Sequence, residues 1–418
     1  MTCANWALTS NAMAQKETNF KQTDIGLIPH DWEVISLGQI GDVKMCKRIF
    51  KSQTKESGEI PFYKIGTFGQ TPDAFIPRSI FEKYKAEYSY PTLGVILLSA
   101  AGTIGRRVKY KGEDAYYQDS NIIWLSHIED KVLNDYLYYA YARVKWTTEK
   151  GAAISRLYNK LFLSAKIPQP PIEEQKRIAE VLSHFDEHID NLVALLEKRK
   201  QVKAATMQAL LSGTTRLPGF TAPWQDIALG KLCLSMNSGG TPDSKNPNFY
   251  GGDIPFLSIA DMTLQGKYVS KTSKTITKEG LDNSSARLVS RGVLLYAMYA
   301  SLGKCSLSCI DLSISQAILA IETNPNLLST NYLYYYLTYI EEAVKTLGQT
   351  GTQTNLSKQL VKEICVTAPT SVKEQEAIAS ILSNMDRWIE TLEQEIKKYR
   401  QMKEGAMEEL LTGKVRLI

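Results

Sequence analysis

The segment PPIEEQKRIAEVL, residues 170–182, returns two hundred residues later as TSVKEQEAIASIL, residues 370–382. Beyond these strings the two copies stay in step without a gap, from Glu174 and Glu374 to the closing strings LLSGTTRL and LLTGKVRL. A match of this length and constant offset indicates that the chain contains two copies of one structural unit.

Each copy of the repeat is predicted to form a long helix. Prolines, which are excluded from helix interiors, precede both copies, and Gly213 and Gly413 follow a double leucine where each helix would stop. Between these limits, apolar residues at alternating spacings of four and three form a heptad seam. The seam residues are Ile178, Leu182, Phe185, Ile189, Leu192 and Leu196 in the first copy and Ile378, Leu382, Met385, Ile389, Leu392 and Ile396 in the second.

A helix of about 40 residues is about 60 Å long, and its seam would stay in water unless another element covers it. We expect the two copies to pair as an antiparallel coiled coil, because the second helix starts from the domain that follows the first. This arrangement would place one globular domain at each end of the pair. The alternative is that each helix packs only on its own domain.

The two segments between the helices also resemble each other, although more faintly. The matching strings are IPHDWEVISLGQI (28–40) with FTAPWQDIALGKL (220–232), GVILLSAAGTIGRR (94–107) with GVLLYAMYASLGKC (292–305), and YLYYA (136–140) with YLYYY (332–336). The apolar runs bounded by glycine predict buried strands, whereas the tyrosine-rich strings have helical spacing. We therefore expect a fold of the α/β class with mixed α+β character, in which two globular domains alternate with two long helices.

The expected domain order follows directly from these boundaries. It consists of an N-terminal extension at residues 1–20 that is partly a cloning remnant, a first globular domain at 21–170, a central long helix at 171–213, a second globular domain at 214–370 and a C-terminal long helix at 371–418.

Composition restricts the class of protein. With 44% hydrophobic and 22% charged residues the chain is expected to be globular, and no apolar run reaches the length of a membrane span. The start of the chain lacks the features of a signal peptide, and the six cysteines are scattered without paired spacing. These features predict a cytoplasmic protein without a disulfide framework, and the net charge of +5 is compatible with a nucleic-acid partner.

The sequence contains no recognisable catalytic or metal-binding motif, so we predict no catalytic residue and no metal site. The chain has no GxxxxGK[ST] phosphate loop and no glycine-rich cofactor fingerprint. The string HFDEH, residues 184–188, matches one metallopeptidase pattern in form, but Phe185 belongs to the helix seam. The second copy has Asn384 and Trp388 at the two histidine positions, so a solvated helix face is the better interpretation.

Basic and polar loops remain as candidate binding surfaces. CKRIFKSQTK (46–55) and GRRVKYKG (105–112) interleave cations with aromatic residues or glycine, and NSGGTPDSKNPNFYGG (237–252) could bring backbone N–H groups near phosphates. Because these loops occur in both duplicated domains, they favour DNA as the ligand. The candidate DNA-binding residues are Lys47, Arg48, Arg106 and Arg107 in the first domain and Ser238, Gly240, Thr241, Lys245 and Lys304 in the second.

In its domain–helix–domain–helix order the chain resembles the specificity subunit of type I restriction–modification systems. The resemblance rests on the strings IGLIPHDWEVISLGQI and SGGTPDSKNPNFYGGDIPFLSIADM, on the glycines of Gly102–Gly105, and on the two EQ-x-x-IA helix openings. It covers residues 25–418. One departure is that SGGTP occurs only in the second half, where the first half has MCKRIFKSQT.

This resemblance implies that each globular domain is a target-recognition domain reading one part of a split site in double-stranded DNA. It also implies that the helices space these domains and dock two methyltransferase subunits, while restriction and translocase subunits join the larger complex. The chain itself would carry no cofactor, and S-adenosylmethionine would belong to the methyltransferase partner.

Two other functions stay open at the level of sequence. One is a self-sufficient DNA-modifying enzyme, a nuclease or methyltransferase with an unfamiliar active site. The other is a pseudodimeric transcription factor that acts without partners. Copurification of a methyltransferase subunit and an assay of the purified chain with S-adenosylmethionine distinguish the three.

Overall fold

A computed structural model of the protein describes residues 19–146, 156–348 and 355–418. Contacts divide the chain into two compact units. Unit 1 contains residues 1–193 and 395–418, and unit 2 contains residues 194–394. Each long helix begins in one unit and ends in the other. The boundaries of the two units therefore lie within the long helices, whereas the boundaries of the expected domains lie at the helix ends.

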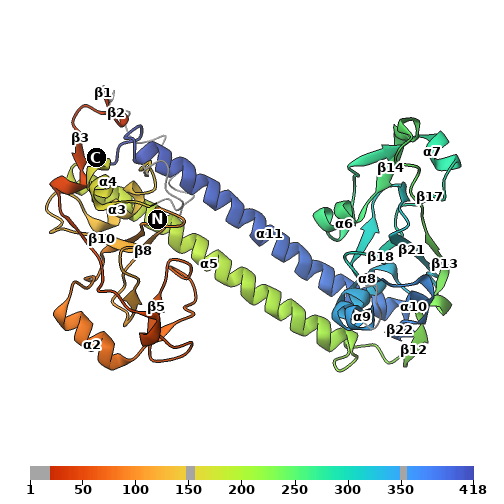
Figure 1. Ribbon diagram of the computed structural model, residues 1–418. Coiled ribbons are helices and arrows are strands. Elements are labelled where there is room, and N and C mark those ends of the chain that lie inside the picture. Colours follow the sequence, from red (N-terminus) through yellow and green to blue (C-terminus); the bar gives the residue numbers. More distant parts are fainter. Residues whose placement is uncertain (1–18, 147–155, 349–354) are drawn as a thin grey trace. The chain divides into compact units, whose positions relative to one another are not determined.

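The two repeat segments form the long helices α5 (Ile172–Leu211) and α11 (Val372–Leu410), of 40 and 39 residues (Figure 1). Helix α5 begins directly after Pro171, and α11 begins three residues after Pro369. Beyond their ends, Gly213 and Gly413 have left-handed backbones with φ of +73° and +68°. This conformation suits glycine and ends an α-helix, as the sequence predicted.

Unit 1 combines small antiparallel and mixed sheets with short helices. A hairpin, a two-stranded ribbon, a four-stranded sheet and a three-stranded sheet have the orders β1-β2, β3-β11, β4-β10-β7-β8 and β6-β5-β9. The strands are β1 (Phe20–Thr23), β2 (Gly26–Pro29), β3 (Glu33–Ser36), β4 (Asp42–Lys44), β5 (Ile60–Tyr63), β6 (Phe75–Ile76), β7 (Ile96–Ser99), β8 (Arg107–Lys109), β9 (Tyr116–Tyr117), β10 (Ile122–Ser126) and β11 (Lys166–Gln169). The helices are α2 (Arg78–Glu87), α3 (Asn134–Ala140) and α4 (Asn159–Ser164).

Unit 2 repeats this plan with additions. Its sheets have the orders β12-β22, β13-β21-β18-β19-β15 and β16-β14-β20-β17. The strands are β12 (Trp224–Ala228), β13 (Cys233–Ser238), β14 (Tyr250–Leu257), β15 (Tyr268–Val269), β16 (Lys274–Ile276), β17 (Arg287–Val289), β18 (Leu294–Ala297), β19 (Cys305–Ser308), β20 (Leu312–Ile314), β21 (Ile318–Thr323) and β22 (Cys365–Pro369). The helices are α6 (Ile259–Gln265), α7 (Lys278–Asp282), α8 (Thr330–Tyr339), α9 (Glu341–Gly348) and α10 (Lys358–Glu363).

The two units therefore share one frame. The ribbon β3-β11 corresponds to β12-β22, the sheet β4-β10-β7-β8 to β13-β21-β18-β19, and β6-β5-β9 to β16-β14-β20. In both three-stranded groups the central strand pairs in parallel with the last, as β5 does with β9 and β14 with β20. Among the described residues, the hairpin β1-β2 occurs only in unit 1, and β15 and β17 are additions of unit 2. The mixed α/β fold expected from the sequence is confirmed.

The glutamine of each repeated Glu-Gln pair anchors its helix to the globular part of the same unit. The buried Gln175 accepts a hydrogen bond from the backbone N–H of Leu133 and donates to the carbonyls of Lys131 and Pro170, at 2.8–2.9 Å. Gln375 accepts from the N–H of Ser329 at 2.8 Å and makes the corresponding bonds to the carbonyls of Leu327 and Pro369. A buried carboxamide that is satisfied in this way fixes the start of the helix.

The glutamate of each pair binds an arginine that follows the other long helix. Glu174, 3% exposed at its side chain, accepts from Arg416 and from the indole N–H of Trp32 at 3.0 Å. In unit 2, the fully buried side chain of Glu374 holds Arg216 through two bonds of 2.7 and 3.1 Å. Each copy of the Glu-Gln pair therefore attaches the start of one long helix to the globular part of its unit and to the segment that follows the other long helix.

Contacts within each unit show that the helices run antiparallel. In unit 1, Asp186 pairs with Lys403, and the ring of His188 lies 4.2 Å from that of Tyr399. In unit 2, Lys200 pairs with Glu393 at 3.0 Å, while Arg216 near the end of α5 reaches the start of α11. Increasing residue number on α5 therefore meets decreasing number on α11, as expected for the coiled coil.

The seam residues are all withdrawn from solvent, but to different degrees. Nine are less than 9% exposed, namely Ile178, Leu182, Phe185, Ile189, Leu192, Leu196, Ile378, Leu382 and Ile396, and three are half-buried, namely Met385, Ile389 and Leu392.

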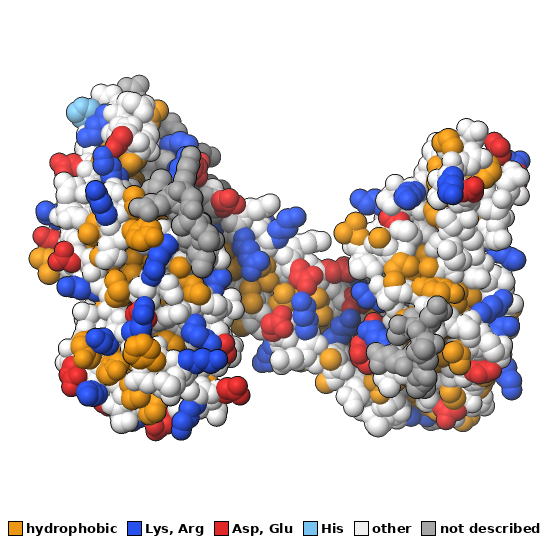
Figure 2. Space-filling model, viewed as in Figure 1, with side chains coloured by type: hydrophobic (Ala, Val, Ile, Leu, Met, Phe, Trp, Pro, Cys, Tyr) orange, Lys and Arg blue, Asp and Glu red, His pale blue; other side chains and the backbone are white. Residues whose placement is uncertain are grey.

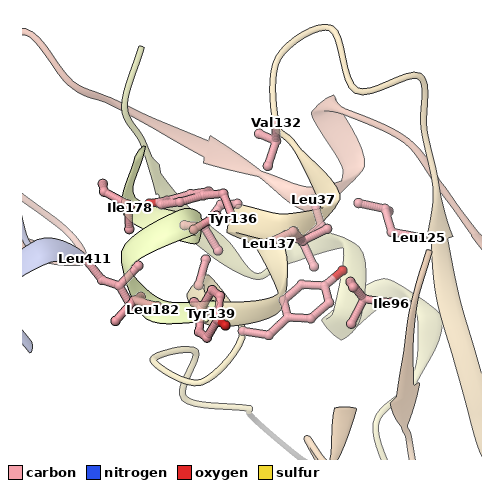
Figure 3. Packing of buried hydrophobic residues seen from close by; sticks show 14 of the residues in the cluster. Leu37, Ile96, Leu125, Val132, Tyr136, Leu137, Tyr139, Ile178, Leu182 and Leu411 are labelled. Carbon is pink, nitrogen blue, oxygen red and sulfur yellow. The ribbon is translucent and has the colours of Figure 1, made fainter. Parts of the chain in front are cut away.

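The first turns of α5 also belong to the core of the globular part of unit 1. Ile178 and Leu182 pack against Tyr136 and Leu137 of α3, and Leu411 joins them from the end of α11 (Figure 3). In unit 2, the first turns of α11 enter a corresponding core, which the end of α5 joins. Both interpretations of the seam are therefore partly true: each helix packs on its own domain at its start and on the other helix along its length.

Among the described residues, no helix combines the length and the apolar content that crossing a membrane requires. Cys46, Cys233, Cys305, Cys309 and Cys365 are free thiols in this part of the chain.

Candidate nucleic-acid interface

A loop after β4 presents two of the predicted cations in unit 1. Cys46 and Ile49 are buried, which holds Lys47 and Arg48 between them in solvent. Burial raises the pKa of the Cys46 thiol to about 12, so this anchor stays neutral. The ammonium of Lys47 lies 4.9 Å from the ring centre of Tyr88, and the Nε of Arg48 donates to Asp119 at 2.8 Å.

Contacts connect this loop to the turn between β7 and β8. Asp119, the partner of Arg48, follows Gln118, whose side-chain oxygen accepts from the N–H of Ile65 at 3.0 Å. Phe68 lies three residues after Ile65, and its carbonyl accepts a hydrogen bond from the guanidinium of Arg106 at 3.1 Å. Lys47, Arg48 and Arg106 therefore belong to one continuous group of loops, and the backbone of Arg106 is held there by the hydroxyl of Ser99.

Arg107 has a different environment from its neighbour. Its guanidinium lies 4.7 Å from the ring centre of Tyr138 on α3, and its Nε is buried with no hydrogen-bond partner among the described residues. Arg106 directly precedes β8 and reaches the carbonyl of Phe68, whereas Arg107 begins β8 and reaches Tyr138, so the two adjacent arginines are directed to different places. The structure brings three of the four predicted residues of unit 1 together and sets Arg107 apart, against α3.

In unit 2, the predicted polar loop is built on tight backbone packing. Ser238 ends β13, and a Cβ atom at Gly240 would approach Ser285 to 2.6 Å. Gly240 is itself buried, so its role here is a close approach of two chain segments. The next residue, Thr241, is exposed and its hydroxyl donates to the side-chain oxygen of Gln316.

The turn between β18 and β19 lies beside this loop. The N–H of Met298 donates to the carbonyl of Ala317 at 2.9 Å, which places the turn next to Gln316. The turn exposes Tyr299 and Lys304, and between them Ala300 has a left-handed φ of +57°. The equivalent position in unit 1 is Gly102, with a φ of +64°. Ala300 therefore holds a strained conformation in a loop that also carries an exposed aromatic ring and a cation.

Lys245 lies further along the polar loop. It is exposed, and its backbone N–H donates to the side chain of Asp243 at 3.0 Å. Among the described residues, no hydrogen bond or ion pair joins its side chain to Thr241, Gln316 or Lys304, so it stands apart from the group formed by the other residues of unit 2.

Gln118 and Gln316 were not chosen as binding residues from the sequence, although they occupy matching places in the repeat. Each receives a hydrogen bond that joins two loops of its unit. Asp119 was missed as well, because its contact with Arg48 joins residues 71 positions apart. Tyr299 was missed although it lies in the same turn as Lys304. In Figure 2, Lys and Arg side chains are spread over the visible face of each globular part and are interspersed with hydrophobic ones. A surface with exposed cations, polar side chains and an aromatic ring can contact phosphates and base edges.

The HFDEH string lies on α5 and does not assemble a metal site. His184 is exposed on the helix, whereas His188 packs against Tyr399. Over the ranges that the structure describes, His, Cys, Asp and Glu side chains form no group of three suited to a metal ion.

Comparison with known proteins gives a family match over most of the chain. The model of the type I restriction modification DNA specificity domain matches twice, at residues 29–202 and 222–399. Each match covers one globular part together with most of the long helix that follows it. The family model thus recognises the same duplication as the sequence repeat and the sheet orders.

Individual relatives agree with this match. A Haemophilus influenzae relative assigned to the type I restriction enzyme specificity subunits is 49% identical over 174 residues, which cover 42% of this chain and 45% of that relative. A Methanocaldococcus jannaschii relative, assigned as the MjaX specificity subunit of a type I restriction enzyme, is 27% identical over 96% of this chain and 98% of its own length. The crystal structure of the S subunit of a type I restriction-modification system from M. genitalium shares the fold, with a TM-score of 0.61 at 17% identity, over 91% of this chain and 96% of that one.

Proposed function

Because this chain belongs to the family of type I restriction modification DNA specificity domains, we propose that it is the DNA-recognition subunit of a type I restriction–modification complex. The globular part of each unit reads one half of a split site in double-stranded DNA. The single observation that carries this function is the duplicated frame, in which matching sheets present different loops. One scaffold used twice with different loops suits two unlike half-sites on one DNA duplex.

The loops that face the DNA are those brought together in each unit. In unit 1 they carry Lys47, Arg48 and Arg106, and in unit 2 they carry Thr241 and Lys304. Exposed cations neutralise phosphates, which gives affinity, while polar and aromatic side chains read base edges, which gives specificity.

The long helices set the distance between the two DNA-reading globular parts and bind two methyltransferase subunits. Their exposed faces remain available for partners because the seam and the junctions with the globular parts use the other faces. In this assignment the chain is not an enzyme. S-adenosylmethionine is bound by the methyltransferase subunits, nuclease–translocase subunits complete the restriction complex, and the complex acts in the cytoplasm.

The experiment compares the purified chain with the chain assembled with its methyltransferase subunit. Both are incubated with genomic DNA and labelled S-adenosylmethionine, and the methyltransferase alone serves as the control. We expect sequence-specific methylation only when both proteins are present. Methyl transfer by the chain alone would overturn the assignment, and so would equal specificity from the methyltransferase without the chain.

A further inference from the structure

One carboxylate in unit 1 joins three segments of the chain. Asp186 of α5 accepts a hydrogen bond from the hydroxyl of Tyr139 on α3 at 2.8 Å and pairs with Lys403 of α11. The ammonium of Lys403 also lies 5.5 Å from the ring centre of Tyr139. The globular part and both long helices therefore meet at this side chain, close to the packed core drawn in Figure 3.

Unit 2 has the same junction at the equivalent residues. Asp386 of α11 accepts from the hydroxyl of Tyr335 on α8 and pairs with Lys203 of α5. Asp186 and Asp386, like Lys203 and Lys403, occupy matching positions of the repeat, and each aspartate takes its lysine from the opposite helix. The side chains of Asp386 and Lys203 are only 17% and 25% exposed, so this pair is shielded from water more than a surface ion pair.

The junction of unit 2 has an additional cation. Lys267 is 8% exposed, lies 3.6 Å from Asp386 and donates to the hydroxyl of Tyr335 at 2.6 Å. The rings of Tyr268, Tyr334 and Tyr335 surround its ammonium at 4.4–5.1 Å. In unit 1, the residue over the matching ring is Arg107, which stacks on Tyr138. The carboxylate of Asp386 thus has a tyrosine hydroxyl and two lysines around it, whereas that of Asp186 has a tyrosine hydroxyl and one lysine.

Such a junction restricts motion that apolar packing alone permits. Hydrophobic contacts have no preferred direction, so beyond the helix start that Gln175 or Gln375 anchors, apolar packing alone would let a globular part rotate at small cost. Hydrogen bonds depend on direction, and a fully connected polar network favours one arrangement over its neighbours.

We propose that Asp186 and Asp386 are positioning residues, which fix the orientation of each DNA-reading part on the helix pair, and that the junction of unit 2 is the stiffer one. This role presupposes the proposed function and adds to it a determinant of the gap between the two half-sites. A complex with a loosened junction would accept DNA in which the gap is one base pair too long or too short.

The test uses the full chain assembled with its methyltransferase and DNAs that differ only in the number of base pairs between the half-sites. The measured quantity is the ratio of affinity for the preferred gap to affinity for gaps one base pair shorter and longer. Partial unfolding lowers every affinity equally and leaves this ratio unchanged, so the ratio separates positioning from stability.

The variants are Asp386→Asn and Asp186→Asn, with Glu390→Gln and Asp190→Asn as controls one turn further along the same helices, where both side chains are exposed. We expect the ratio to fall roughly tenfold for Asp386→Asn, as loss of a charge-assisted hydrogen bond implies, and less for Asp186→Asn. The controls should keep the wild-type ratio. Tyr335→Phe and Tyr139→Phe, which remove only a hydroxyl, replace the aspartate variants if those fail to fold.

An unchanged ratio in folded aspartate or tyrosine variants would overturn the positioning role. An equal fall in both units would overturn the difference in stiffness. Failure of the proposed function looks different, because the wild-type complex itself would then show no preference among half-sites or gaps.

Discussion

Gly405 and Gly413 lie eight residues apart near the end of the chain, and the structure gives them opposite roles. Gly413 has a φ of +68°, and a Cβ atom there would come within 2.3 Å of Pro29. Gly405 lies inside α11, where a Cβ atom would meet no described atom within 4 Å. At the position matching Gly405, the first helix has Ala205.

We therefore expect Gly413→Ala to lower the free energy of unfolding by about 1–3 kcal/mol, from backbone strain and the clash with Pro29. Gly405→Ala should raise it by about 0.8–1 kcal/mol, because alanine is the better helix former. Chemical denaturation of both variants measures the difference. Equal effects of the two substitutions would contradict the assigned roles.

Asp31 makes the stability of the Arg416–Glu174 contact depend on pH, because Arg416 also binds Asp31. The Arg416 guanidinium, which donates to Asp31 at 2.8 and 2.9 Å, holds the pKa of that carboxyl below its ordinary value. A carboxyl with a lowered pKa in the folded state stabilises the fold above its unfolded pKa, near 4, and this contribution is lost as pH falls through the folded pKa.

Asp31→Asn should therefore lower Tm slightly at pH 7, and the difference from wild type should shrink as the pH falls below about 4 toward the lower folded pKa. The effect is small because the side chain of Asp31 is 57% exposed. Thermal unfolding between pH 3 and 7 measures it, with the exposed Glu33→Gln as the control variant. A difference in Tm that grows in acid would contradict this sign.

At the scale of elements, the long helices were predictable because their signals are local. Each helix is marked by prolines before it, a glycine after it and a heptad seam between them, and all of these lie close together in the sequence. Helices α5 and α11 begin and end within these limits. Their antiparallel direction followed from chain order. The sheet orders were not predictable, because strands such as β5 and β9 meet through residues more than fifty positions apart.

The candidate site was predictable only in part, for the same reason. Basic loops are visible in the sequence, but Arg107 faces Tyr138, which arrives with α3 from thirty residues away. Gly240 was expected to approach phosphates through its backbone, yet it is buried where Ser285 from a distant segment closes over it. Neither partner can be identified from the local pattern. The loop that carries Lys47 and Arg48 remains the simplest prediction for a DNA contact in unit 1.

Replacing Lys47 and Arg48 together by alanine should weaken DNA binding by the assembled complex. If both neutralise phosphates, the slope of log affinity against log salt should fall in magnitude by about 1.8. Arg107→Met should instead lower the stability of unit 1 and leave the salt slope unchanged, because its guanidinium is engaged with Tyr138. Binding titrations at several salt concentrations decide this, and an unchanged slope for the alanine variant would remove the loop from the interface.

At the scale of the whole molecule, we propose that two DNA-reading globular parts on one pair of helices recognise a split DNA site. If the helices set the gap, lengthening both should lengthen it. Four residues inserted into each helix add about one turn, or roughly 6 Å, which corresponds to nearly two base pairs at about 3.4 Å each. The insertions overshoot a helical turn by about 40°, and two base pairs rotate a half-site by about 70°, so affinity can fall while the preferred gap shifts.

Methylome sequencing of a host that carries the chain with its methyltransferase tests this claim most directly. For the wild-type chain we expect one methylated motif made of two different half-sites separated by unspecified bases. For the chain with both insertions we expect the same half-sites with a gap longer by about two base pairs. A single uninterrupted motif, or an unchanged gap with the folded and active insertion variant, would contradict the account.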